Sequence, residues 1–112
     1  MDSSDLYSTT LITLSNLRNF MMSEEWIEAV NQAPLNVKKQ AFSASFQVQH
    51  AINVLSNQIL SDIADEMAEQ DAAIIAATQS LSDSLENFKK VSTVLASIGK
   101  LLGVIAQIVS LV

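Results

Sequence analysis

Residues that form turns are so scarce in this chain that most sheet folds are disfavoured. The 112 residues include one proline, Pro34, and two glycines, Gly99 and Gly103. Sheets need turn residues about every 8–12 positions, and Gly and Pro are the strongest of these. Apolar residues make up 49% of the chain, and a single domain of this length buries about two thirds of its unfolded surface. We therefore predict an all-α fold with one helical domain over residues 1–112, either an antiparallel helical bundle or a long helical hairpin.

Hydrophobic periodicity and capping residues predict where the first helices begin and end. Ser3 or Ser4 can cap the first helix, since a serine hydroxyl can accept from a backbone N–H of the first turn. We expect a break near Ser23, which can cap a second helix. Pro34 ends that helix, because the residue before a proline avoids the α region. The first two predicted helices span residues 5–22 and 24–33.

A further break is needed between Leu35 and Ile98, a segment that contains neither Gly nor Pro. One helix over that range would be about 96 Å long, too long for a compact domain. The preferred break is at Asp71, which can cap a new helix, and the alternative is near Asp83 and Glu86, which have capping-box spacing. The predicted helices are residues 36–69 and 72–112, the last either continuous or broken near residues 80–83.

The predicted helix over residues 36–69 has an apolar face wider than half its circumference, which is typical of a central bundle helix. Its polar face carries no formal charge between Gln40 and Ser61. That face is either an ordinary solvated surface or one covered by another helix or subunit. The residues predicted to form the apolar face are Phe42, Phe46, Val48, Ile52, Leu55, Ile59, Leu60, Ile63 and Met67.

The C-terminal segment, predicted to be a strongly apolar helix, carries two parallel rows with alternating steps of three and four. The first is a heptad seam, typical of coiled coils and left-handed helix packing. It consists of Val91, Leu95, Ile98, Leu102, Ile105, Val109 and Val112. The second is a small-residue row of Ser92, Ala96, Gly99, Gly103, Ala106 and Ser110. A helical glycine costs about 1 kcal/mol relative to alanine, so two of them predict close approach of a neighbouring helix.

The same segment raises the question of a membrane. Its mean hydropathy is that of a spanning helix, and Lys89 and Lys90 flank its start. Lys100, however, lies near its middle, where a charge costs about 2.5–3.5 kcal/mol. Lys100 and Gln107 fall on one side with Lys89 and Thr93 and form a narrow polar edge. Such an edge favours a bundle helix, or one that leaves a bundle for an interface, over a plain anchor.

Charge and composition exclude several classes of function. The net charge is −6, and an acidic surface without a basic cluster does not favour nucleic-acid binding. The absence of cysteine excludes disulfides and thiolate metal sites. The N-terminus has acids where a signal peptide has bases. We therefore predict that the chain has no signal peptide and is located in the cytoplasm, with membrane association as the alternative.

No residue pattern in the chain points to catalysis, a cofactor or a metal. The densest acidic cluster, Asp62, Asp65, Glu66 and Glu69, is interpreted as a solvated helix face, since a di-metal site needs Glu-x-x-His pairs. The one histidine, His50, is assigned to a polar helix face. Trp26 is predicted to lie in the core. We therefore expect a protein that is not an enzyme and has no cofactor.

Three hypotheses remain for the function. The first is an interaction protein that forms a homo-oligomer, or pairs with another helical protein, through the seam and the small-residue row. The second is a membrane-active or pore-forming protein that shelters residues 91–112 in a soluble bundle, an arrangement whose plan is similar to that of helical pore-forming toxins. The third is a tail-anchored membrane protein.

Overall fold

The computed structural model describes residues 2–111, and most of these residues are in α-helices. Within that range it has six helices and no strand. The helices are α1 (Ser3–Phe20), α2 (Glu24–Asn31), α3 (Leu35–Ser56), α4 (Leu60–Glu69), α5 (Asp71–Glu86) and α6 (Val91–Ile105). The predicted all-α fold is confirmed.

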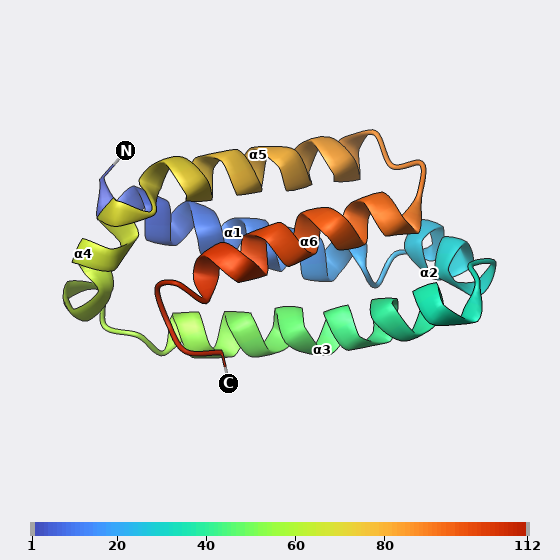
Figure 1. Ribbon diagram of the computed structural model, residues 1–112, viewed down its shortest axis with the longest axis horizontal. Helices are drawn as coiled ribbons and strands as arrows, with labels where there is room; N and C mark the ends of the chain where they lie inside the picture. Colours follow the sequence, from blue (N-terminus) through green and yellow to red (C-terminus); the bar gives the residue numbers. More distant parts are fainter. Residues whose placement is uncertain (1, 112) are drawn as a thin grey trace.

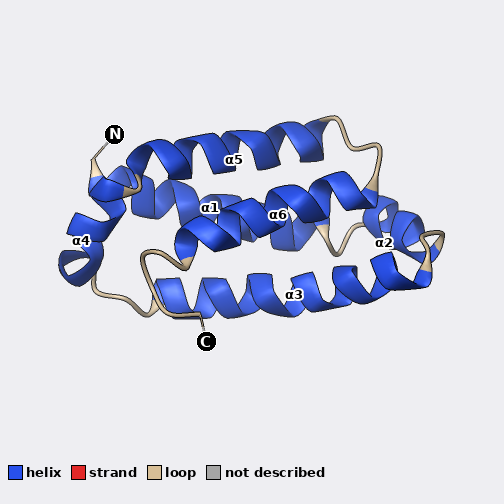
Figure 2. Ribbon diagram, viewed as in Figure 1, coloured by secondary structure: helices blue, strands red, loops and turns tan. Residues whose placement is uncertain are grey.

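Four long helices form the body of the molecule, and the two short helices α2 and α4 lie at opposite ends (Figure 1). Helix α1 packs against α3 and α5, and α6 packs against the same two helices from the other side. The chain reverses direction between α1 and α3, between α3 and α5, and between α5 and α6, so α3 and α6 run the same way. A loop alone joins α5 to α6, whereas α2 lies between α1 and α3, and α4 lies between α3 and α5 (Figure 2). The arrangement is a four-helix bundle with mixed directions, whereas an antiparallel bundle or a hairpin was predicted.

The core lies between these four helices and draws on each of them. Burying a large aliphatic side chain stabilises a fold by about 1.5–3 kcal/mol, and all four long helices contribute such side chains. The least exposed are Leu6, Leu14, Leu17, Val48, Leu55, Ile74, Leu81, Val94, Leu101 and Ile105. Met67 of α4 is also fully buried and closes one end of this core.

An aromatic cluster closes the other end. Trp26 of α2 is 3% exposed, as predicted for a core residue. Its ring lies 5.7 Å from Phe20, at the end of α1, and 5.7 Å from Phe88, in the loop between α5 and α6. Phe20 and Phe88 meet edge to face at 5.3 Å, a favourable geometry for aromatic rings.

The caps of the first two helices partly match the sequence prediction. Ser23 accepts a hydrogen bond from the backbone N–H of Trp26, so the second helix begins where expected. The cap of α1 is Asp2, whose carboxylate accepts from the N–H of Asp5 at 2.9 Å. The prediction of Ser3 or Ser4 was wrong, because an aspartate one position earlier offers an equivalent cap.

The predicted helix over residues 36–69 is in fact two helices. The chain leaves the helical conformation after Asn57, and Ile59 is extended with φ −87° and ψ 122°. At this bend the hydroxyl of Tyr7 donates to the carbonyl of Leu55 at 2.8 Å. The bend turns α4 across the end of the bundle, so that Ile63 and Met67 cover the core.

The predicted helix over residues 72–112 is also divided. Helix α5 begins at Asp71, where the preferred break was expected, although Gln70 is its cap position. The second break falls at residues 87–90, not at 80–83, and α5 continues through Asp83, whose carboxylate accepts from Gln79. Phe88 lies in this later loop, and its ring is part of the aromatic cluster. The last helix ends at Ile105, so a helix to residue 112 was wrong.

Candidate interaction surface

Helix α6 occupies the corner of the bundle between α5 and α3 (Figure 1). It buries one stripe of apolar side chains at steps of three and four, which continues into the turn after the helix. The stripe consists of Val91, Val94, Ile98, Leu101, Ile105 and Ile108. This stripe is the side of α6 that holds it in the bundle.

The predicted heptad seam overlaps this stripe but is not identical to it. Val91, Ile98, Ile105 and Val109 are buried. The other two described members, Leu95 and Leu102, are half-buried. The seventh member, Val112, lies outside the described residues. Most of the seam is therefore used within the chain's own fold.

The small-residue row faces solvent. All six members, Ser92, Ala96, Gly99, Gly103, Ala106 and Ser110, are exposed. A Cβ placed on Gly99 or Gly103 would meet no atom within 4 Å, apart from its neighbours and the helix's own backbone, in the part of the chain that is described. The expected close approach of a helix at these glycines is thus not made within the chain, and contact with a second chain stays a prediction.

The rotation of α6 explains this outcome. Successive helical residues are about 100° apart, and α6 buries Val94 and Leu101 where the seam would have buried Leu95 and Leu102. Either rotation of α6 would bury a heptad that includes Val91, Ile98 and Ile105. The observed rotation turns the small-residue row away from the core and onto the outside of the bundle.

Two shallow hollows lie between the exposed glycines and α3. One is lined by Gln47, His50, Leu102, Gly103 and Leu111. The other is lined by Gln40, Ser43, Ala44, Gln47, Leu95, Ile98 and Gly99. Together they make a depressed surface along the parallel helices α3 and α6, with glycine on one side and uncharged polar residues on the other.

The C-terminal segment after α6 folds back across α3. The ring Nε2 of His50 lies 3.1 Å from the carbonyl oxygen of Leu111. His50 is otherwise exposed, as expected for a residue on a polar helix face. Its contact with Leu111 closes one end of the surface described above.

The uncharged polar face of α3 is exposed to solvent in this chain. Ser43, Gln47, His50 and Asn53 are all exposed, and Gln49 is half-buried. Gln49 donates to Asn53 at 3.0 Å and accepts from Arg18 at 3.4 Å. No helix of the described chain covers this face.

Two aromatic side chains are not where the sequence suggested. Phe42 is 64% exposed and Phe46 is 79% exposed, although both were predicted to widen the core face. Ile59, predicted to be buried, is 66% exposed because it lies in the bend before α4. Large exposed apolar groups on neighbouring turns are unusual. The sequence did not predict this patch, because hydrophobicity alone does not show which side of a helix faces the core.

The predicted polar edge of α6 does face solvent. Lys89, Thr93, Lys100 and Gln107 are all exposed.

Helix α6 has 15 residues, whereas a helix that crosses a bilayer needs about 20. None of the helices in residues 2–111 combines the length and the apolar character that a membrane crossing requires.

The acidic cluster has the character of a solvated surface. Asp62, Asp65, Glu66 and Glu69 are all exposed on α4. Over the described residues, no group of three or more His, Asp or Glu side chains is arranged to hold a metal ion.

Comparisons with protein-family models, with curated proteins and with solved structures found no match for this chain.

Proposed function

We propose that this protein is a non-enzymatic α-helical interaction protein, which self-associates or pairs with another helical protein across the small-residue row of α6. The observation that carries the proposal is the exposure of Gly99 and Gly103, with open space above both among the residues that the structure describes. Leu95 and Leu102, the half-buried seam residues, flank the row.

The energetics of glycine support this role. Each helical glycine lowers helix stability by about 1 kcal/mol relative to alanine, and no other helix in residues 2–111 packs closely against either position. A helix that docks along the row would gain that packing, because small residues let two backbones approach closely.

The neighbouring polar face also suits a partner. Between Gln40 and Ser61 the chain has no formal charge, so a helix that covers this part of α3 does not bury an ion there. Desolvating an unpaired charge costs far more than covering amide and hydroxyl groups that can re-form their hydrogen bonds.

Site-specific photocrosslinking tests the proposal and identifies the occupant. A benzophenone amino acid in place of Lys100 lies exposed beside the row, and the same group in place of Ile75, exposed on α5, is the matched control. We expect adducts from position 100 with a second copy or with a helical protein, and none of these from position 75.

The specificity of such adducts is checked with Gly103→Leu. A Cβ at Gly103 would meet no atom within 4 Å among residues 2–111, apart from its neighbours and the helix's own backbone, so we expect this change to leave the monomer folded while it blocks close approach. We expect the position 100 adducts to disappear in the Gly103→Leu background. Adducts that persist unchanged, or that form equally from position 75, would refute the docking surface.

We also propose a second candidate, a membrane-active protein that releases residues 91–112 from the bundle. It is supported by the sheltering of Val94, Ile98 and Leu101 between α5 and α3. Lys100 is the one charged residue of this segment, so a released segment would have a large apolar surface for a bilayer interface.

Dye release from lipid vesicles tests this second candidate. Ser84 and Ser97 have their hydroxyl oxygens 2.8 Å apart on α5 and α6. Because the chain lacks cysteine, the pair Ser84→Cys and Ser97→Cys can lock α6 to α5 by one disulfide. If the protein is membrane-active, the reduced form of this variant releases the dye and the oxidised form does not. Equal dye release by both forms, or no dye release by the wild type, would rule out this second candidate.

A further inference from the structure

An apolar strip lies on the outer side of α3. Leu35, Phe42 and Phe46 follow one another at steps of seven and four, which places them on one helix face. They are 68%, 64% and 79% exposed. Phe46 has the largest exposed fraction among the large apolar side chains described. This aromatic strip is separate from the small-residue row, since the hollows beside the row have other residues of α3 in their walls.

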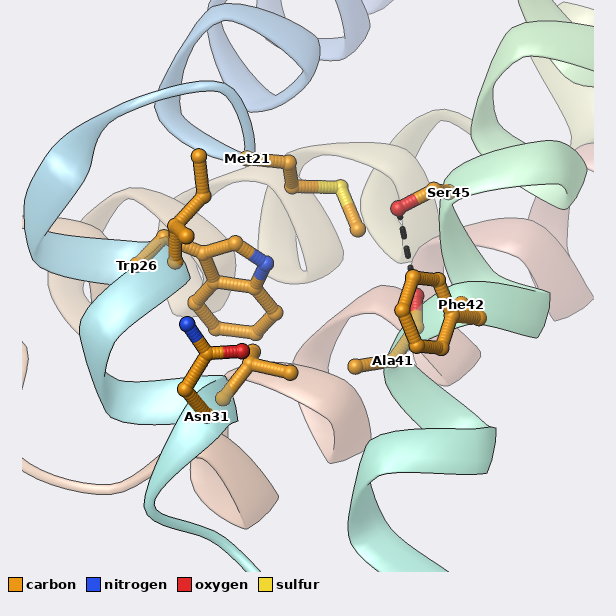
Figure 3. A pocket seen from close by; sticks show the side chains of 8 residues that line it. Met21, Trp26, Asn31, Ala41, Phe42 and Ser45 are labelled. Carbon is orange, nitrogen blue, oxygen red and sulfur yellow. Dashed lines mark hydrogen bonds between the residues drawn. The ribbon is translucent and has the colours of Figure 1, made fainter.

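A cleft opens beside the strip, between α2 and α3 (Figure 3). It has a volume of about 110 Å³ and reaches the indole of Trp26. Its walls are mostly apolar: Met21, Trp26, Ile27, Val30, Asn31, Ala41, Phe42 and Ser45. The Ser45 hydroxyl is already used, since it donates to the carbonyl of Ala41 at 3.1 Å. The cleft is therefore suited to an apolar side chain, and Phe42 stands at its edge.

Charge points to a second copy as the occupant. The protein has a net charge of −6, so two copies repel one another unless they meet through a face without acids. The α3 segment from Leu35 to Ser56 contains no acid, and its only formal charges are Lys38 and Lys39. Two copies that meet along α3 therefore keep their acids away from the contact and avoid that repulsion.

The exposed apolar area approaches what a dimer interface needs. A standard interface buries about 800 Å² on each partner, of which roughly 56–65% is apolar, or about 450–520 Å². A phenylalanine offers about 150–250 Å², so the exposed fractions of Phe42 and Phe46 supply about 200–350 Å². The exposed parts of Leu35 and Ile27, 68% and 48%, raise this toward the required area.

We infer that the aromatic strip is a self-association interface, in which two α3 helices pack antiparallel about a two-fold axis between Phe42 and Phe46. In this arrangement Phe46 of one copy lies opposite Phe42 of the other and enters the cleft beside Trp26. A two-fold interface is self-complementary, so each copy gives one ring and receives one. An aromatic anchor in a pocket is the usual form of an interface hot spot.

Sedimentation and light scattering over a concentration series test the inference with the intact chain. We expect the mass of the wild type to rise from that of one chain to that of two as the concentration increases. Phe46→Gln should lower the affinity of the two copies for one another by about tenfold or more. The matched control is Ile12→Gln, which removes a side chain of 60% exposure on α1. Both changes are on the surface, and circular dichroism checks that both variants remain folded.

Tryptophan fluorescence gives a second readout of the same contact. Trp26 is the one tryptophan of the chain and lines the cleft. We expect its emission to change with concentration in the wild type and in Ile12→Gln, but not in Phe46→Gln.

Three results would overturn the inference. The first is a wild type that stays monomeric throughout the concentration series. The second is a dimer that Phe46→Gln leaves intact. The third is binding to neutral lipid vesicles that depends on Phe46 in a monomeric protein, since this would assign the strip to a membrane. A dimer lost in Gly103→Leu but kept in Phe46→Gln would place self-association on α6 instead, which separates this inference from the proposed function.

Discussion

Ser84 of α5 and Ser97 of α6 face one another with their hydroxyl oxygens 2.8 Å apart. Ser84 also donates to the carbonyl of Ser80 at 3.0 Å, so the proton between the two serines belongs to Ser97. Ser97 is only 6% exposed. Val94 and Leu101 lie on the same side of α6 as Ser97 and are also buried, so the hydrogen bond acts together with apolar burial to favour the rotation that exposes the glycines.

Removing this hydrogen bond should cost a moderate amount of stability. We expect Ser97→Ala to lower the free energy of unfolding by about 0.5–1.5 kcal/mol, the usual net value of such a bond. Ser92→Ala, at an exposed position of the same helix, shares the gain in helix propensity and serves as the control. Urea denaturation measures both, and a Ser97→Ala variant no less stable than Ser92→Ala would show that the bond does not hold α6.

Truncation of two adjacent leucines tests the rotation of α6 itself. Leu101 is fully buried, whereas Leu102 is half-buried. We expect Leu101→Ala to cost about 2–5 kcal/mol and Leu102→Ala clearly less. The reverse order in thermal unfolding would mean that the seam through Leu95 and Leu102 faces the core after all.

The rotation of α6 could not be predicted from its own sequence. Its apolar residues surround so much of the helix that two heptad patterns share Val91, Ile98 and Ile105. Periodicity identifies a buried side only when the opposite side is polar. The choice depends on tertiary partners such as Ser84, which no local pattern reveals.

Helix positions were predictable where a specific cap or proline marks them. Ser23 and Pro34 both lie at observed helix ends. The bend at Asn57 was missed, because it contains neither Gly nor Pro and no capping hydroxyl. Phe42 and Phe46 were assigned to the core because they are apolar, although apolar residues are also common on surfaces.

The aromatic cluster should contribute strongly to stability through the loop between α5 and α6. Phe88 contacts both Phe20 and Trp26. Complete removal of a buried phenylalanine costs about 3–5 kcal/mol, so we expect Phe88→Ala, at a half-buried position, to cost about 1–3 kcal/mol. The emission of Trp26 should also move to longer wavelength as water reaches the indole.

The control for this prediction is Phe46→Ala, which removes an equally large ring from the surface. In dilute protein we expect it to leave both the melting curve and the emission of Trp26 unchanged. A loss of stability as large as that of Phe88→Ala would contradict the exposure of Phe46 on α3.

The most direct measurement for the whole account is the thermal unfolding of Gly99→Ala combined with Gly103→Ala, in protein dilute enough to be monomeric. A Cβ at either glycine has open space around it within the described part of the chain, so alanine should add only helix propensity, about 1–2 kcal/mol in total. That raises the melting temperature by roughly 4–8 °C per kcal/mol. A lower melting temperature would mean that another helix of the same chain already packs against these glycines, and that the surface proposed for a partner is not free.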